Sequence, residues 1–70
     1  MVQYLVVIEP ADGNLSAYSP DLPGCVATGR DLDDVRNRMA EAIRFHLDGL
    51  REDGLPVPPP SARAAYLPAR

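Results

Sequence analysis

Hydrophobic and polar positions follow a two-residue period at the start of the chain, which predicts a β-strand. Residues 2–9, VQYLVVIE, are rich in β-branched and aromatic side chains. Val2, Tyr4, Val6 and Ile8 fall on one face of this strand. Leu5 and Val7 make its second face half apolar, so we expect both faces of the sheet to be covered.

Turn residues separate this strand from two shorter ones. Asp12-Gly13, within PADGN, predicts the pivot of a hairpin whose second strand covers residues 15–18. The following SPDLPG contains Pro20 and Pro23, which cannot donate ladder hydrogen bonds and therefore predict a loop. Residues 25–29 predict a third strand that ends at Gly29.

The period then becomes helical. Asp31 is a good N-cap, and Asp33 and Asp34 lie in the first turn, where the helix dipole favours negative charge. Apolar positions spaced by three and four form one stripe: Leu32, Val35, Met39, Ala42, Ile43, His46 and Leu50. Side-chain pairs are expected at Asp34–Arg38 and Glu41–Arg44. Gly54 is the expected C′ residue of a helix of about 20 residues.

The end of the chain is rich in proline. PVPPPSAR predicts an extended connector, and AAYL, residues 64–67, predicts either a short fourth strand or a tail. We therefore expect an α+β fold in which a three- to four-stranded antiparallel sheet carries one long helix, in the order β-β-β-α-(β). Residues 1–60 form the domain, and residues 61–70 form the tail or the fourth strand.

The small size of the chain limits how it can be stabilised. Chains near 70 residues bury only roughly 60% of the surface that their unfolded form exposes. The single Cys excludes an internal disulfide, and one Cys with one His is too few for a structural zinc site. Self-association into a homodimer or a higher oligomer is the remaining way to bury more surface.

The charge of the chain bears on its partners. Seven arginines, no lysine and ten acidic residues give a formal net charge of −3. This balance argues against direct binding of nucleic acid and favours contact with a basic protein surface. The apolar run at residues 4–8 is too short for a signal peptide or a membrane span, so we expect a cytoplasmic protein with a reduced thiol.

Two groups of side chains suggest chemistry, and each has a simpler interpretation. Cys25 and His46 would be a nucleophile and its base, but a buried apolar thiol and a structural histidine in the helix stripe are preferred. Asp21, Glu9 and Asp12 would hold a divalent metal. The simpler role for Asp21 is to bond the loop amides between the two prolines.

Phe45 is the side chain most suggestive of a contact surface. It lies off the apolar stripe of the helix, beside Arg38 and Glu41, where an isolated monomer would favour a polar residue. Together with the half-apolar second face of the first strand, it predicts a surface that meets a copy of the chain or a partner.

The hairpin, the stretch YSPDLPGCVATG, the acidic N-cap and the helix with its DGLPVPPP exit together resemble the HicB-like antitoxin family of toxin–antitoxin systems. The resemblance covers roughly residues 2–60 and implies a sheet-and-helix fold similar to a reduced ribonuclease H core. It also implies a non-enzymatic protein, without a cofactor or a metal, that binds and blocks HicA, a small basic toxin that cleaves messenger RNA. Family members usually add a C-terminal DNA-binding domain. Only ten residues follow Pro60, so a short form without that domain is expected.

The corner SPDLPGC is expected to be rigid, and it either shapes a binding surface or only maintains the fold. The residues expected to bind a partner are Tyr18, Pro20, Asp21, Leu22, Pro23, Gly24 and Phe45. One rival hypothesis is an orphan self-associating domain that binds another protein or a small ligand. A second rival is a remnant metal-dependent nuclease that uses Asp21, Asp12 or Glu9.

Overall fold

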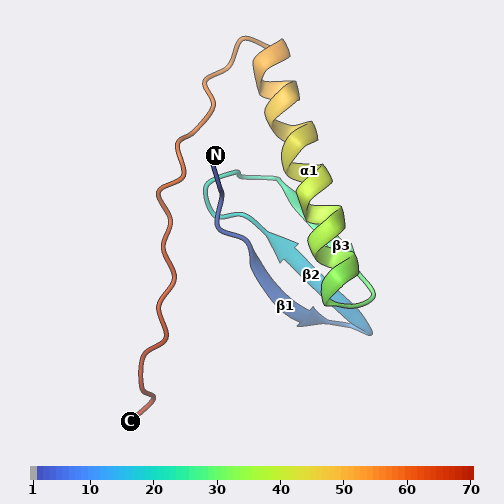
Figure 1. Ribbon diagram of the computed structural model, residues 1–70, viewed down its shortest axis with the longest axis vertical. Coiled ribbons are helices and arrows are strands. Elements are labelled where there is room, and N and C mark those ends of the chain that lie inside the picture. Colours follow the sequence, from blue (N-terminus) through green and yellow to red (C-terminus); the bar gives the residue numbers. More distant parts are fainter. Residues whose placement is uncertain (1) are drawn as a thin grey trace.

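The computed structural model describes residues 2–70 and contains three strands followed by one helix (Figure 1). The elements are β1 (Val7–Ala11), β2 (Asn14–Tyr18), β3 (Val26–Gly29) and α1 (Leu32–Glu52). The strands form one antiparallel sheet in the order β1-β2-β3, and α1 packs against β2 and β3 on one face. The predicted α+β class and the order β-β-β-α are confirmed.

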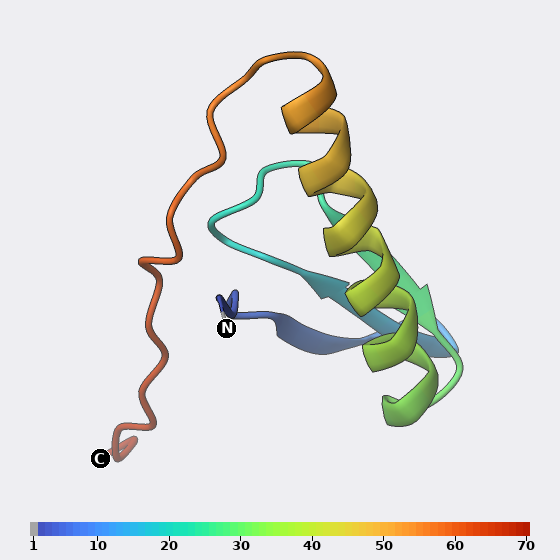
Figure 2. The same cartoon turned by 45° about the horizontal axis from the view of Figure 1, so that its top comes forward.

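The C-terminal segment, residues 55–70, contains no strand. Of the two alternatives predicted for residues 64–67, the structure therefore has the tail and not the fourth strand. Both views show this segment running extended on the side of the N-terminus, away from α1 (Figures 1 and 2). Proline explains the conformation, because residues 58–60 are three consecutive prolines without a backbone N–H to donate to a ladder.

The first strand begins later than predicted, at Val7 rather than at residue 2. Register is the reason: Val7 pairs with Tyr18, which is the last residue of β2, so residues 2–6 have no ladder partner. Pro10 is accommodated because β1 is an edge strand, where a missing N–H can face solvent. The hairpin turn falls at Asp12–Gly13 as predicted, with Gly13 at φ +77°.

The helix begins and ends as predicted. The Asp31 carboxylate accepts a hydrogen bond from the Asp34 N–H at 2.8 Å, which caps the first turn. Gly54 adopts φ +68° after the last turn, and its N–H donates to the Arg51 carbonyl at 3.1 Å.

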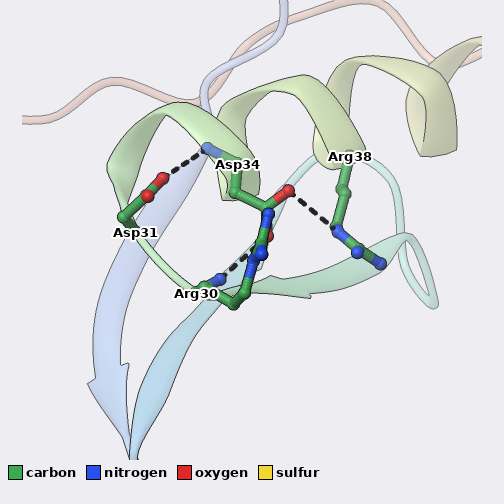
Figure 3. A network of polar contacts seen from close by, with 4 residues as sticks. All are labelled: Arg30, Asp31, Asp34 and Arg38. Carbon is green, nitrogen blue, oxygen red and sulfur yellow. Dashed lines mark hydrogen bonds and ion pairs between the residues drawn. The ribbon is translucent and has the colours of Figure 1, made fainter.

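The ion pairs along the helix match the prediction only in part. The Asp34 carboxylate also pairs with Arg38 at 3.2 Å, as expected, and with Arg30 at 3.5 Å (Figure 3). The expected Glu41–Arg44 pair is not formed, and Arg51 pairs with Asp48 instead, at 3.3 Å. These pairs lie on exposed surface, where each stabilises the fold only slightly.

The core lies between α1, β2 and the loop that joins β2 to β3. Its buried members are Ala17, Leu22, Cys25, Val35 and Met39. The predicted helix stripe is therefore largely confirmed, although Leu32, in the first turn, is 52% exposed. Leu22 is buried even though it lies in a loop between Pro20 and Pro23.

Candidate partner-binding surface

The corner between β2 and β3 folds inward through two consecutive turns. Leu22 N–H donates to the Ser19 carbonyl at 3.1 Å, and Cys25 N–H donates to the Leu22 carbonyl at 3.0 Å. The hydroxyl of buried Ser19 donates to the Leu5 carbonyl at 2.8 Å, which ties the corner to the N-terminal segment. Gly24 completes the turn at φ +83°, a left-handed conformation that favours glycine. The left-handed conformation predicted for Gly24 is therefore confirmed, and the rigidity of the corner stays a prediction.

Asp21 holds the C-terminal segment against this corner. Its carboxylate accepts hydrogen bonds from Ser61 N–H at 2.9 Å, from the Ser61 hydroxyl at 3.0 Å and from Ala62 N–H at 2.9 Å. The Ala62 and Ser61 amides lower the pKa of Asp21 below its usual 3.8, because they stabilise the charged form. The predicted bonding of Asp21 to loop amides between the prolines is therefore wrong: the loop turns are closed by backbone carbonyls.

A second contact holds the same segment farther along the chain. The Tyr4 hydroxyl donates to the Pro58 carbonyl at 2.6 Å. Between the C-terminal segment, the N-terminal residues and α1 lies a groove of about 1020 Å³. Apolar side chains line it together with three arginines of α1: Arg36, Arg44 and Arg51. This flank of the helix is basic, although the whole chain is acidic.

The face of the sheet opposite α1 carries an apolar row. Val7, Tyr18 and Val26 are cross-strand neighbours in register, one from each strand. Tyr18 is 41% exposed and Val26 is 63% exposed, and none of the three belongs to the core cluster. We call this row the open-face row. Of the two apolar residues that the sequence placed on the second face of the first strand, Val7 lies in this row, whereas Leu5 precedes β1.

Phe45 is 84% exposed, as its position off the stripe predicted. It does not lie on the open face, however, because α1 covers the other side of the sheet. Phe45 instead borders the outer edge of β3, where two hollows of about 420 and 400 Å³ share Phe45 and Ala42 in their linings. The predicted single surface of open face and Phe45 is therefore two surfaces, on either side of the β3 edge.

Cys25 and His46 both line the hollow of about 420 Å³. Cys25 is only 4% exposed, and burial raises the pKa of its thiol, which disfavours the nucleophilic thiolate. The structural interpretation of Cys25 is thus confirmed.

The arrangement of acidic side chains bears on the predicted metal site at Asp21, Glu9 and Asp12. Across residues 2–70, no group of three or more His, Cys, Asp or Glu side chains converges in a way that would hold a metal ion. Over the same residues, no helix has the length and apolar character needed to cross a membrane.

The seven predicted binding residues occupy four places: the open-face row, the β3 edge, the surface of the corner and the core. Tyr18 lies in the open-face row, and Phe45 lies at the β3 edge, where Gly24 lines the same hollow. Pro20 and Pro23 are exposed on the corner. The Asp21 carboxylate between them is hydrogen-bonded to Ser61 and Ala62. Leu22 is 0% exposed, so its side chain supports the core and presents nothing to a partner.

Val26 was missed as a candidate, although the alternation of residues 25–29 places it opposite buried Cys25. The contact of Ser61 with Asp21 was also missed. The sequence does hold a signal for it, because Ser61 carries the first backbone N–H after three prolines and so offers a donor to an acidic side chain.

Comparison with known proteins gives one family and one relative. The family model for the HicB-like antitoxin of bacterial toxin–antitoxin systems matches residues 4–69. An uncharacterized 14.9 kDa protein from the rep–hol intergenic region of Haemophilus phage HP1 (strain HP1c1) is 31% identical over 64 residues. The aligned part is 91% of this chain and 48% of the phage protein, so the chain spans about half the length of that relative. No solved structure matches, and the likeness to a ribonuclease H core stays a prediction.

Proposed function

The chain belongs to the HicB-like antitoxin family of bacterial toxin–antitoxin systems, and we propose that it binds and neutralises a small, basic, HicA-like toxin that cleaves messenger RNA. It does so by binding alone, without catalysis or a cofactor. Because the toxin's target is messenger RNA, the pair acts in the cytoplasm. The family match over residues 4–69 is the observation that carries this proposal.

The open-face row is the surface that we assign to the toxin. Protein interfaces favour an aromatic or apolar centre with a polar rim, and Tyr18 stands at the centre of the row between Val7 and Val26. Glu9 and Ser16 pair in the next row on the same face and provide a polar, acidic rim. A net charge of −3 favours approach of a basic partner.

The corner contributes to this surface through its shape. Pro20 and Pro23 are exposed beside the end of β2, which is the end that carries Tyr18. Their fixed φ angles keep the corner ordered in the free protein, so little conformational entropy is lost when a partner binds. Asp21 acts indirectly, by holding the C-terminal segment.

The test begins with capture of the toxin. The tagged chain is used to isolate proteins from its native cytosol, the bound protein is identified by mass, and its RNA cleavage is measured with and without the chain. We expect a stoichiometric small basic protein whose cleavage of RNA the chain suppresses. Recovery of the chain alone, or of a partner that does not cleave RNA, would overturn the proposal and favour the orphan self-associating domain.

Two matched substitutions locate the surface. Tyr18→Asp places a charge at the centre of the open-face row, and Tyr66→Asp makes the same change at a fully exposed site in the C-terminal segment. We expect Tyr18→Asp to weaken toxin binding by at least about tenfold and Tyr66→Asp to leave it unchanged. Equal affinities for the two variants would mean that the toxin binds elsewhere on the chain.

A further inference from the structure

The two edges of the sheet differ in their protection. An exposed edge strand presents unpaired backbone N–H and C=O groups, and natural proteins usually protect it with proline, charge or a covering segment. The β1 edge has such protection, because it carries Glu9 and Pro10. The β3 edge consists of Val26, Ala27, Thr28 and Gly29, without a charge or a proline, and no other strand among residues 2–70 pairs with it.

The surface beside the β3 edge is shaped to receive another chain. Two hollows lie between this edge and α1, and Phe45 projects between them with 84% of its surface exposed. The hollow of about 420 Å³ lies towards Val26 and Gly24, and the hollow of about 400 Å³ lies towards Thr28. The edge therefore carries both an aromatic projection and an open hollow.

We propose that β3 pairs antiparallel with β3 of a second copy of the chain, so that two sheets become one continuous six-stranded sheet. A two-fold axis at Ala27 places each Ala27 opposite its equivalent and Val26 of one copy opposite Thr28 of the other. This register satisfies strand geometry, because residues opposite each other across a ladder must project to the same face. Ala27 is small and lies on the face towards α1, so its own side chain puts no bulk at the axis on that face.

The β3 edge is complementary to itself, and for this reason we assign a second copy of the chain as its partner. Antiparallel pairing reverses the edge, so Phe45 of one copy meets the Thr28 end of the other. The hollow at that end is lined by Ala27, Thr28, Arg38, Glu41 and Ala42, and by that copy's own Phe45 at its border. Arg38 offers a guanidinium to the aromatic face, and the alanine and threonine offer apolar contact. One edge supplies both halves of the contact, which is the requirement for a self-complementary two-fold interface.

The first test measures the mass of the full chain in solution by analytical ultracentrifugation. We expect a dimer, and we expect Phe45→Asp to weaken dimerisation on the order of 100-fold, because it places a charge in the partner's hollow. Phe45 is 84% exposed and lies outside the core cluster, so circular dichroism should show an intact variant. Leu67→Asp, at another exposed apolar residue, is the control and should stay dimeric. A monomeric parent chain, or equal masses for the two variants, would overturn the proposal.

The second test examines the register. In a Cys25→Ala background, Val26→Cys protein is mixed with Thr28→Cys protein under mild oxidation. Directly opposite residues have Cβ atoms about 4.5–5.5 Å apart, whereas diagonal ones lie about 7–8 Å apart, which is too far for a disulfide. We expect rapid cross-linking in the mixture and little in either protein alone. Cross-linking of each protein with itself, or none in the mixture, would contradict this register.

Both tests use the chain without a toxin, so their results are independent of the antitoxin proposal. A dimer that binds no toxin would contradict the proposed function only. A monomer that neutralises a toxin would contradict the β3 pairing only.

Discussion

The Asp21 carboxylate accepts two hydrogen bonds from Ser61, one from the backbone N–H at 2.9 Å and one from the hydroxyl at 3.0 Å, across 40 positions of sequence. A third bond comes from the Ala62 N–H. These contacts join the corner of the sheet to a segment that has no regular secondary structure. Together with the bond from the Tyr4 hydroxyl to the Pro58 carbonyl, the Asp21 carboxylate positions the C-terminal segment beside the body of the domain.

Replacing Asp21 should release this segment while leaving the sheet and the helix intact. Asp21→Ala removes all three acceptor contacts, and Asp21→Asn keeps one acceptor oxygen but loses the charge. We expect amide hydrogen exchange at Ser61 and Ala62 to rise to the rate of a free peptide in Asp21→Ala, with an intermediate rise in Asp21→Asn. Asp48→Ala, at another exposed carboxylate, is the control. Unchanged protection at Ser61 in Asp21→Ala would show that other contacts hold the segment.

The same contact should respond to acid. The Ala62 and Ser61 amides lower the pKa of Asp21 in the folded chain, so its folded pKa lies below the unfolded value of about 3.8. A depressed carboxyl pKa stabilises the folded form above the unfolded pKa, and that contribution is lost as the pH falls through the folded pKa. We therefore expect the Ser61 and Ala62 amide signals in NMR spectra to change with a midpoint below pH 3.8, and to lose this transition in Asp21→Asn.

Asp34 provides an internal comparison for that titration. The Arg30 N–H and the Arg38 side chain lower the pKa of Asp34 as well, so the start of α1 should titrate in the same acidic range. Asp21→Asn should leave this second transition in place. If Asp21→Asn abolishes both the Ser61 and the Asp34 transitions, the NMR signals report global acid unfolding rather than release of the segment.

Local interactions explain which elements could be predicted from the sequence. The Asp31 cap bonds the Asp34 N–H three residues ahead, and Gly54 bonds the Arg51 carbonyl three residues back, so both ends of the helix are set by local contacts and were predicted correctly. The start of β1 depends on where β2 ends, because Val7 has Tyr18 as its partner and residue 5 has none. The register depends on both strands, so the apolar character of residues 2–6 alone could not predict where β1 begins.

The candidate site was predicted less well for the same reason. Phe45 was correctly placed at the surface, because helical spacing alone decides its side of α1. The partners of Asp21 and the burial of Leu22 depend on how distant segments pack, and a loop rich in proline gives no periodic signal for either. The exposed edge of β3 follows from strand order, which the sequence pattern did not specify.

Leu22 should contribute to stability rather than to binding. Its side chain is completely buried among the core residues, so Leu22→Ala removes apolar contacts and leaves a cavity. Such substitutions cost about 2–5 kcal/mol of unfolding free energy, a large part of the stability of a small domain. Urea denaturation should show this loss, whereas Leu67→Ala, at an exposed site, should change stability by less than about 0.5 kcal/mol. A fully stable Leu22→Ala variant would place Leu22 at the surface in solution.

Alanine substitutions at Gly29, which packs against α1, and at Gly49, which lies within α1, should change the unfolding free energy in opposite directions. A Cβ at Gly29 would meet the Val35 backbone, with the Val35 Cα at 2.6 Å and its Cβ at 2.8 Å, and backbone atoms cannot rotate away. Gly29→Ala should therefore destabilise the fold by about 1–3 kcal/mol, because β3 must separate from α1.

Gly49 lies inside α1, with nothing within 4 Å of an added Cβ, so Gly49→Ala should stabilise the fold by up to about 1 kcal/mol through helix propensity. Thermal and urea unfolding of the two variants measures both effects with the same side-chain change. If the changes in unfolding free energy had the same sign, β3 and the first turn of α1 would not be as close in solution as the packing of Gly29 against Val35 requires.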